Sequence, residues 1–160
     1  MIEVIPGNLL EAKEKIIGHQ TNCKGIMGSK EDKKKTTNVA SQLRQKYGDK
    51  LFKPYKTLCD ENHDLLGTVQ ALEMSDGKII CNMFAQDNYG YAEKQYTSLE
   101  SFRKCCESLR TFATTKGIWS VAMPYKIGSN RGGASWTDVY SILKEVFKEG
   151  KVKLVLYMKE

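Results

Sequence analysis

Two kinds of apolar pattern alternate along this chain. Short apolar runs, or alternation of apolar with polar positions, predict strands, whereas apolar residues repeating every three or four positions predict helices. A strand is expected wherever the first pattern occurs, near 1–6, 15–19, 67–73, 79–84, 118–123 and 152–158. Helices are expected at 8–12, 39–47, 97–116 and 136–148.

Turn and cap residues sharpen some of these boundaries. Thr97 followed by Glu100 forms a capping-box signature at the start of the longest helix. Asp76-Gly77 predicts a hairpin turn between two strands. Pro54 interrupts a helix-like spacing at 52–58, and we expect it to limit that segment to a first helical turn.

Strands separated by helices, together with one hairpin, predict an α/β protein with three layers, in which a central mixed sheet has helices on both faces. We expect one domain over residues 1–160. In open α/β sheets, ligands bind beyond the carboxyl ends of the strands. The loops that follow the predicted strands are therefore where a site is expected.

Two of these loops are rich in glycine. Residues 18–29 follow the apolar pair Ile16-Ile17, and residues 127–133 follow another apolar run. Glycine allows the backbone to approach a ligand closely, and successive backbone N–H groups in a tight loop bind anions. Two such loops at one edge of a sheet predict a clamp on a ligand with more than one phosphate.

Composition narrows the choice of partner. The net charge of +6 favours polyanions, but no basic run is interleaved with stacking aromatic residues, so RNA binding rests on charge alone and we do not expect a nucleic-acid partner. The five cysteines are not spaced as metal ligands and indicate reduced thiols in a cytoplasmic protein. No apolar stretch is long enough to span a membrane. We expect a monomer.

The charged segment at 30–37 breaks the alternation of strands and helices. It contains no apolar residue and separates the first glycine-rich loop from its helix, which Asn38 would cap. Two interpretations stay open: a solvated loop, or a basic flap that closes over bound phosphates.

These motifs together resemble those of macrodomains, which are ADP-ribose-binding α/β modules. The resemblance is to the small stand-alone branch that includes ADP-ribose 1″-phosphate phosphatases and ADP-ribosyl-glutamate hydrolases. It covers nearly the whole chain and is carried by the blocks at 7–10, 19–29, 65–67, 80–84, 93–95, 123–128 and by Trp136.

The resemblance implies a ligand site and no cofactor. Asn8, with Leu9, would lie where the family usually has an aspartate that accepts the adenine amino group, and Asn22 would contact the distal ribose. The two loops would hold the diphosphate and distal ribose. The implied ligand-binding residues are Asn8, Leu9, Thr21, Asn22, Lys24, Gly25, Ile26, Met27, Gly28, Gln86, Ile127, Gly128, Ser129, Asn130, Arg131 and Gly132.

Catalytic residues match less well. Gln86 stands where the glutamate-deacylating branch has a nucleophilic lysine, and the second loop lacks that branch's aspartate. His19 aligns with a histidine of the phosphatase branch, at the predicted end of its strand. It would act as a general acid or base, or only hydrogen-bond the loop.

Two functions therefore remain open. The chain hydrolyses ADP-ribose derivatives, foremost ADP-ribose 1″-phosphate, or it binds ADP-ribose, free or attached to protein, without chemistry.

Overall fold

The structure is a computed structural model that describes residues 1–28, 38–90, 94–130, 132–148 and 150–159. In this part of the chain, strands and helices alternate much as the apolar pattern predicts. The elements in chain order are β1 (Ile2–Pro6), η1 (Leu9–Glu11, a 3-10 helix), β2 (Ile16–Thr21), α1 (Val39–Tyr47), α2 (Asp49–Glu61), β3 (Val69–Glu73), β4 (Ile79–Phe84), α3 (Leu99–Lys116), β5 (Ser120–Pro124), α4 (Trp136–Lys148) and β6 (Lys153–Met158).

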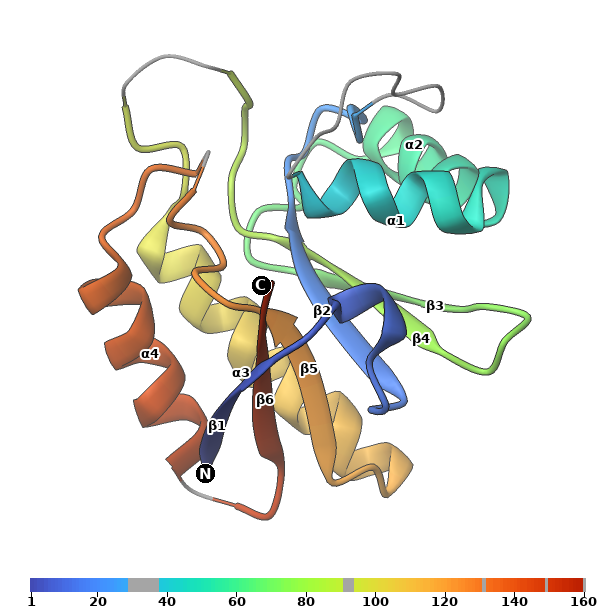
Figure 1. Ribbon diagram of the computed structural model, residues 1–160. Helices are drawn as coiled ribbons and strands as arrows, with labels where there is room; N and C mark the ends of the chain where they lie inside the picture. The colour runs from blue at the N-terminus through green and yellow to red at the C-terminus, as the bar shows by residue number, and fades with distance from the viewer. Residues whose placement is uncertain (29–37, 91–93, 131, 149, 160) are drawn as a thin grey trace.

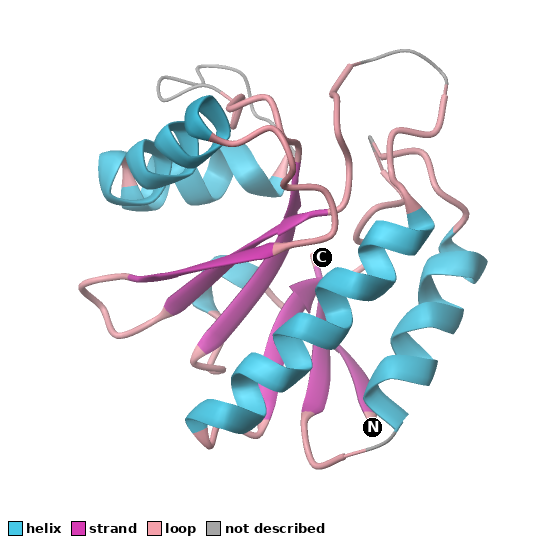
Figure 2. Ribbon diagram, turned by 180° about the vertical axis from the view of Figure 1, so that it is seen from behind, coloured by secondary structure: helices cyan, strands magenta, loops and turns pink. Residues whose placement is uncertain are grey.

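The strands form a single mixed sheet in the order β1-β6-β5-β2-β4-β3, in which only β3 runs antiparallel to its neighbour among the pairs of the described strands. Helices α1 and α2 cover one face, and α3 and α4 cover the other (Figures 1 and 2). The predicted three-layer α/β/α architecture is confirmed. None of the described helices combines the length and apolar character that a membrane span requires.

Each face of the sheet has its own apolar core. Leu109 and Val139, from α3 and α4, are fully buried on one side, and Leu43 and Tyr55, from α1 and α2, are fully buried on the other. Strand β4 lies inside the sheet and all its residues are buried, as its apolar sequence predicts. The loops after β2, β4 and β5 gather at one edge of the sheet, so both glycine-rich loops lie at its carboxyl end (Figure 1).

The prediction for the helix around Pro54 was wrong. Helix α2 runs through Pro54 for a full 13 residues. Proline removes one backbone donor from the helix, but Leu51, Tyr55 and Cys59 are buried along the face that meets the sheet. Packing along this face outweighs the lost hydrogen bond.

Two local boundaries also differ from the prediction. The hydroxyl of Ser98, rather than that of Thr97, caps α3 by accepting from the backbone N–H of Ser101. Strand β2 continues through Gln20 and Thr21, because β4 pairs with it as far as Phe84. His19 therefore lies inside a strand and does not end it.

Candidate functional site

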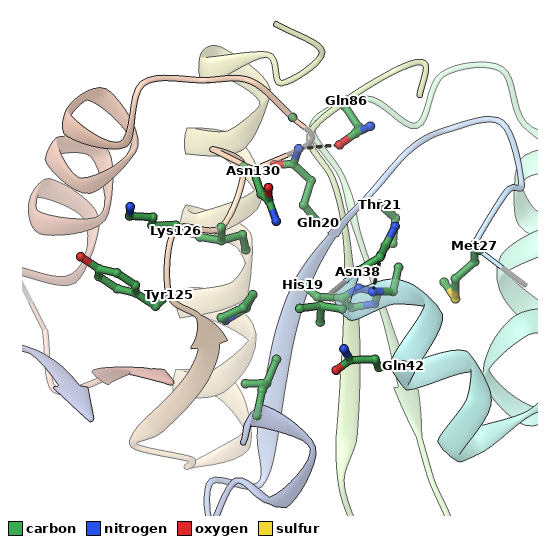
Figure 3. Close-up of a pocket in the computed structure, with 18 of the residues that line it drawn as sticks. His19, Gln20, Thr21, Met27, Asn38, Gln42, Gln86, Tyr125, Lys126 and Asn130 are labelled. Carbon is green, nitrogen blue, oxygen red and sulfur yellow. Dashed lines mark hydrogen bonds between the residues drawn. The ribbon is translucent and has the colours of Figure 1, made fainter. Parts of the chain in front are cut away.

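A cavity of about 440 Å³ opens at the carboxyl edge of the sheet, within the size range of small-molecule sites. Its wall is formed by η1, the end of β2, both glycine-rich loops and the start of α1 (Figure 3). The structure brings thirteen of the predicted site residues to this wall: Asn8, Leu9, His19, Thr21, Asn22, Ile26, Met27, Gly28, Gln86, Ile127, Gly128, Asn130 and Gly132.

Three other predicted residues, all described by the structure, are not on this wall. Lys24, whose ammonium group lies 3.3 Å from the Asp87 carboxylate, is directed to the segment after β4. Gly25 packs against Lys56 of α2, and Ser129 lies between two wall residues without being one itself. Arg131 and the charged segment at 30–37 lie outside the described residues.

Several wall residues were missed by the sequence analysis. Tyr125 and Lys126 follow β5 directly, and Tyr157 and Lys159 come from the end of β6. Their position at the end of a strand or just after it was the available signal, but Tyr125-Lys126 and the segment at 157–159 contain no glycine. Among the described residues of the wall, Lys126 and Lys159 are cationic and none is acidic. The cavity is therefore suited to an anionic ligand.

The first glycine-rich loop is organised by the side chain of Asn22. Its Oδ1 accepts from the backbone N–H groups of Lys24, at 2.9 Å, and Ile26, at 3.5 Å, while its Nδ2 donates to the carbonyl of Ile26 at 2.7 Å. The buried hydroxyl of Tyr55 lies 2.8 Å from the Asn22 carbonyl oxygen and 2.9 Å from Oδ1. Asn22 thus shapes the loop and also lies on the cavity wall.

The end of this loop is held against α1. Met27 is 1% exposed, and a Cβ added to Gly28 would overlap the hydroxyl of Ser41 and lie 2.7 Å from its Cβ. Gly28 also has a φ of 58°, which L-residues seldom adopt. Glycine is therefore required here for close packing on the helix.

The second glycine-rich loop is joined to β2 and α3 by buried polar side chains. The Thr97 hydroxyl donates to the Gly128 carbonyl at 2.8 Å and accepts from Gln20 Nε2 at 2.7 Å. Gln20 Nε2 also donates to Gln86 Oε1 at 2.7 Å, as Figure 3 shows. The backbone N–H groups of Tyr96 and Thr97 both donate to the Gly132 carbonyl. Thr97, predicted as a helix cap, instead fixes this loop.

Lys126 has an unusual backbone conformation at the entrance to the second loop. Its φ of 63° makes it the one non-glycine residue with positive φ in the described part of the chain. A lysine in this region is strained by about 1 kcal/mol or more, and such strain concentrates at functional sites. A glycine would adopt this conformation without strain, but the chain has a lysine here, whose ammonium group lies 5.9 Å from the centre of the Tyr125 ring.

His19 is 1% exposed and lines the cavity from the α1 side of β2. Its Nε2 lies 2.6 Å from Oδ1 of Asn82 on β4. Burial lowers the pKa of His19 from 6.5 to about 4, although the hydrogen bond to Asn82 opposes this shift. The imidazole is therefore neutral at pH 7.

Asn8 caps the 3-10 helix η1, a role typical of asparagine at the start of a helix. Its Oδ1 accepts from the backbone N–H of Leu10 at 3.0 Å, while the residue is exposed on the cavity rim. This capping role and the ligand contact that the resemblance implies for Asn8 are compatible in this arrangement.

The Cys23 thiol, in the first glycine-rich loop, is partly buried. Burial raises the pKa of the Cys23 thiol to about 11, and the nearby Asp87 carboxylate adds to the shift, so the thiol stays protonated at neutral pH. No group of three or more His, Cys, Asp or Glu side chains is placed to hold a metal ion within the described ranges.

Comparisons with known proteins give a clear result for the fold. No protein-family model and no curated protein matches the sequence. The macrodomain of DarG from Mycobacterium tuberculosis matches with a TM-score of 0.81 at 24% identity, over 98% of this chain and 97% of that one. The DarG macrodomain from Thermus aquaticus gives 0.78 at 20%, over 98% and 97%.

A third match contains a ligand. The structure of Thermosipho africanus DarTG in complex with ADP-ribose has a TM-score of 0.77 at 14% identity, covering 98% of this chain and 41% of that one. The resemblance that the glycine-rich loops indicate is thus confirmed at the level of three-dimensional structure: this chain has the macrodomain fold.

Proposed function

We propose that this protein binds ADP-ribose, free or attached to another protein, in the cavity at the carboxyl edge of the sheet. One observation carries the proposal: two glycine-rich loops flank a cavity whose described wall has two lysines and no acidic residue. This arrangement suits the two negative charges of a diphosphate. The likeness to DarTG, solved with ADP-ribose, supports the same choice of ligand.

The proposed orientation takes the roles that the resemblance to macrodomains implies for Asn8 and Asn22, both of which lie on the wall. The adenine would lie toward Asn8 and Tyr157, and the diphosphate between the two loops. The distal ribose would lie toward Asn22. Asn8 lacks the charge of an aspartate, so its contribution to adenine selectivity would be that of a neutral hydrogen bond.

Hydrolysis of the ligand, the other function expected from the sequence, stays a prediction. The neutral imidazole of His19 is in the protonation state that a general base needs, but a pKa of about 4 makes it a weak base at pH 7. The described residues of the wall also include no carboxylate that could act as a second general acid or base. These features favour binding without turnover.

Titration calorimetry with ADP-ribose tests the proposal. We expect micromolar affinity, roughly −7 to −8 kcal/mol. Lys126→Glu should weaken binding at least ~10-fold, because it reverses a charge on the wall. Lys50→Glu is the matched control, since Lys50 is exposed on α2 and is not a wall residue. Absence of binding at millimolar ADP-ribose would refute the proposal.

A separate assay addresses turnover. Release of phosphate from ADP-ribose 1″-phosphate, and of ADP-ribose from modified protein, would be measured for wild type, His19→Ala and Gln86→Ala. A hydrolase that depends on His19 should lose ~100-fold or more in His19→Ala and little in Gln86→Ala. A binding module should show no turnover in any of the three.

A further inference from the structure

Three buried side-chain atoms that need hydrogen bonds have no partner in the described structure. They are His19 Nδ1, Gln20 Oε1 and Ser129 Oγ. His19 and Gln20 line the cavity, and Ser129 lies between two of its wall residues. An unpartnered buried polar atom costs about 1–3 kcal/mol, so three at one sheet edge indicate that a ligand supplies the missing partners.

The tautomer of the His19 imidazole is set by a chain of side-chain hydrogen bonds that crosses β3, β4 and β2. The chain begins at the Pro54 carbonyl of α2, which accepts from Gln70 Nε2 at 3.2 Å. Gln70 Oε1 accepts from Asn82 Nδ2 at 3.0 Å, and Asn82 Oδ1 is 2.6 Å from His19 Nε2. Asn82 is the register partner of both His19 and Gln70, so the three side chains lie in one row.

The carbonyl at the start of this chain fixes the direction of every bond. A carbonyl oxygen only accepts, so Gln70 must present its amide nitrogen to Pro54 and its oxygen to Asn82. Asn82 then presents its own oxygen to His19, whose Nε2 must carry the proton. In a neutral imidazole the other nitrogen has no proton. His19 Nδ1 is therefore an acceptor.

Building on the proposed function, we propose that His19 Nδ1 receives a hydrogen bond from the 1″-hydroxyl of the distal ribose, and that Asn82 and Gln70 are positioning residues that keep it an acceptor. Gln20 Oε1, the second unpartnered atom on the wall, is also an acceptor, because Gln20 Nε2 is the donor to Gln86 and Thr97. This part of the wall thus requires donors from the ligand.

A phosphate group cannot meet that requirement. A phosphate dianion in place of the 1″-hydroxyl offers acceptor oxygens only, and its charge would face the lone pair of His19 Nδ1 and the amide oxygen of Gln20. The site should therefore select ADP-ribose, whose distal ribose has a free 1″-hydroxyl, over ADP-ribose 1″-phosphate.

Nitrogen NMR of the free protein tests the first step. The chain has only two histidines, so long-range ¹H–¹⁵N spectra can be assigned with His63→Gln. We expect His19 in the Nε2–H form at pH 7, and a shift of its Nδ1 resonance when ADP-ribose binds. A protonated Nδ1 in the free protein would overturn the inference without touching the proposed function.

Calorimetry with both compounds tests selectivity. Wild type should bind ADP-ribose at least ~10-fold more tightly than its 1″-phosphate. Asn82→Asp places a carboxylate at Nε2, which favours the doubly protonated ring and turns Nδ1 into a donor, so the ratio should fall at least ~5-fold. Gln70→Met, which frees the Asn82 amide to turn over, should lower the ratio even if Asn82→Asp does not fold.

The outcomes separate the two claims. Equal affinity of wild type for the two compounds, or a ratio unchanged in folded Asn82→Asp and Gln70→Met, would overturn the selectivity inference. Failure of wild type to bind either compound would overturn the proposed function.

Discussion

The imidazole of His19 and the amide of Asn82 lie side by side on adjacent parallel strands, with Nε2 and Oδ1 2.6 Å apart. Both side chains are almost completely shielded from solvent. A buried imidazole resists protonation, because the charged form loses its hydration. The pair therefore links the ligand site to the pH dependence of folding.

The first prediction is that His19 makes the protein less stable in mild acid. Its pKa is about 4 when folded and 6.5 when unfolded, so the unfolded state binds more protons between these values. The folded protein therefore has its full stability, as far as His19 is concerned, above pH 6.5, and loses stability as the pH falls toward 4. Between pH 7 and pH 5, the free energy of unfolding in urea should fall by about 2 kcal/mol from His19 alone.

The variant His19→Gln checks this origin. Glutamine can still donate to Asn82 but does not titrate, so the decrease between pH 7 and 5 should largely disappear. His63→Gln, at an exposed site, should retain it. An equal decrease in wild type and His19→Gln would assign the pH dependence to other groups.

Much of the fold could be predicted because local signals agree with tertiary packing. The predicted helix at 136–148 has the observed bounds of α4, and its buried residues are all apolar: Val139, Ile142, Leu143, Val146 and Phe147. Asn8 caps its helix as its residue type predicts. The helix through Pro54 could not be predicted, because its stability comes from burial of Tyr55 and its neighbours in a core that the local sequence does not reveal.

The site was harder to predict than the fold. Both loops could be located from their glycines, because a backbone with positive φ or close packing favours glycine at that position in the sequence. The side chains that position His19 and the second loop could not be identified from any local sequence pattern. Asn82 occurs within an apolar run, and Gln70 meets it only through the antiparallel register of β3 with β4. Contacts of this kind depend on strand pairing, which composition does not specify.

The second prediction concerns the anchor of the first loop. Tyr55→Phe removes the hydroxyl that lies between two oxygens of Asn22 and should cost about 1–2 kcal/mol of stability. The loop would then be less well fixed, so ADP-ribose affinity should also fall severalfold. Tyr47→Phe is the control, because its hydroxyl contacts Asp76 and Tyr47 is not a wall residue. Unchanged affinity in Tyr55→Phe would show that Asn22 holds the loop without this contact.

The third prediction concerns the second loop. Thr97→Val keeps the shape of the side chain but leaves the Gly128 carbonyl without its hydroxyl donor. We expect a loss of about 1–3 kcal/mol in stability and weaker ADP-ribose binding. Thr97→Ser retains the hydroxyl and should keep most of the affinity. Urea unfolding and calorimetry measure both effects, and similar affinities for Val and Ser variants would count against a role for this hydroxyl.

The fourth prediction separates two reasons for glycine at position 28. Gly117, at the end of α3, also has positive φ, 69°, but has no atom within 4 Å of an added Cβ. Gly117→Ala should therefore cost only conformational strain, about 1–2 kcal/mol. Gly28→Ala adds an overlap with Ser41 of α1 and should cost about 1–3 kcal/mol more, with a loss of ADP-ribose binding as the loop shifts.

A double-mutant cycle isolates the steric part of that cost. Ser41→Gly removes the hydroxyl and the Cβ that an alanine at position 28 would meet, at a helix-propensity cost of about 1 kcal/mol. In the double variant Gly28→Ala/Ser41→Gly, the two changes should therefore be less destabilising together than their sum, with a coupling of at least about 1 kcal/mol. Binding should recover in part, because the loop can again pack on α1. Additive effects on stability would mean that strain at positive φ, rather than contact with the helix, requires glycine at position 28.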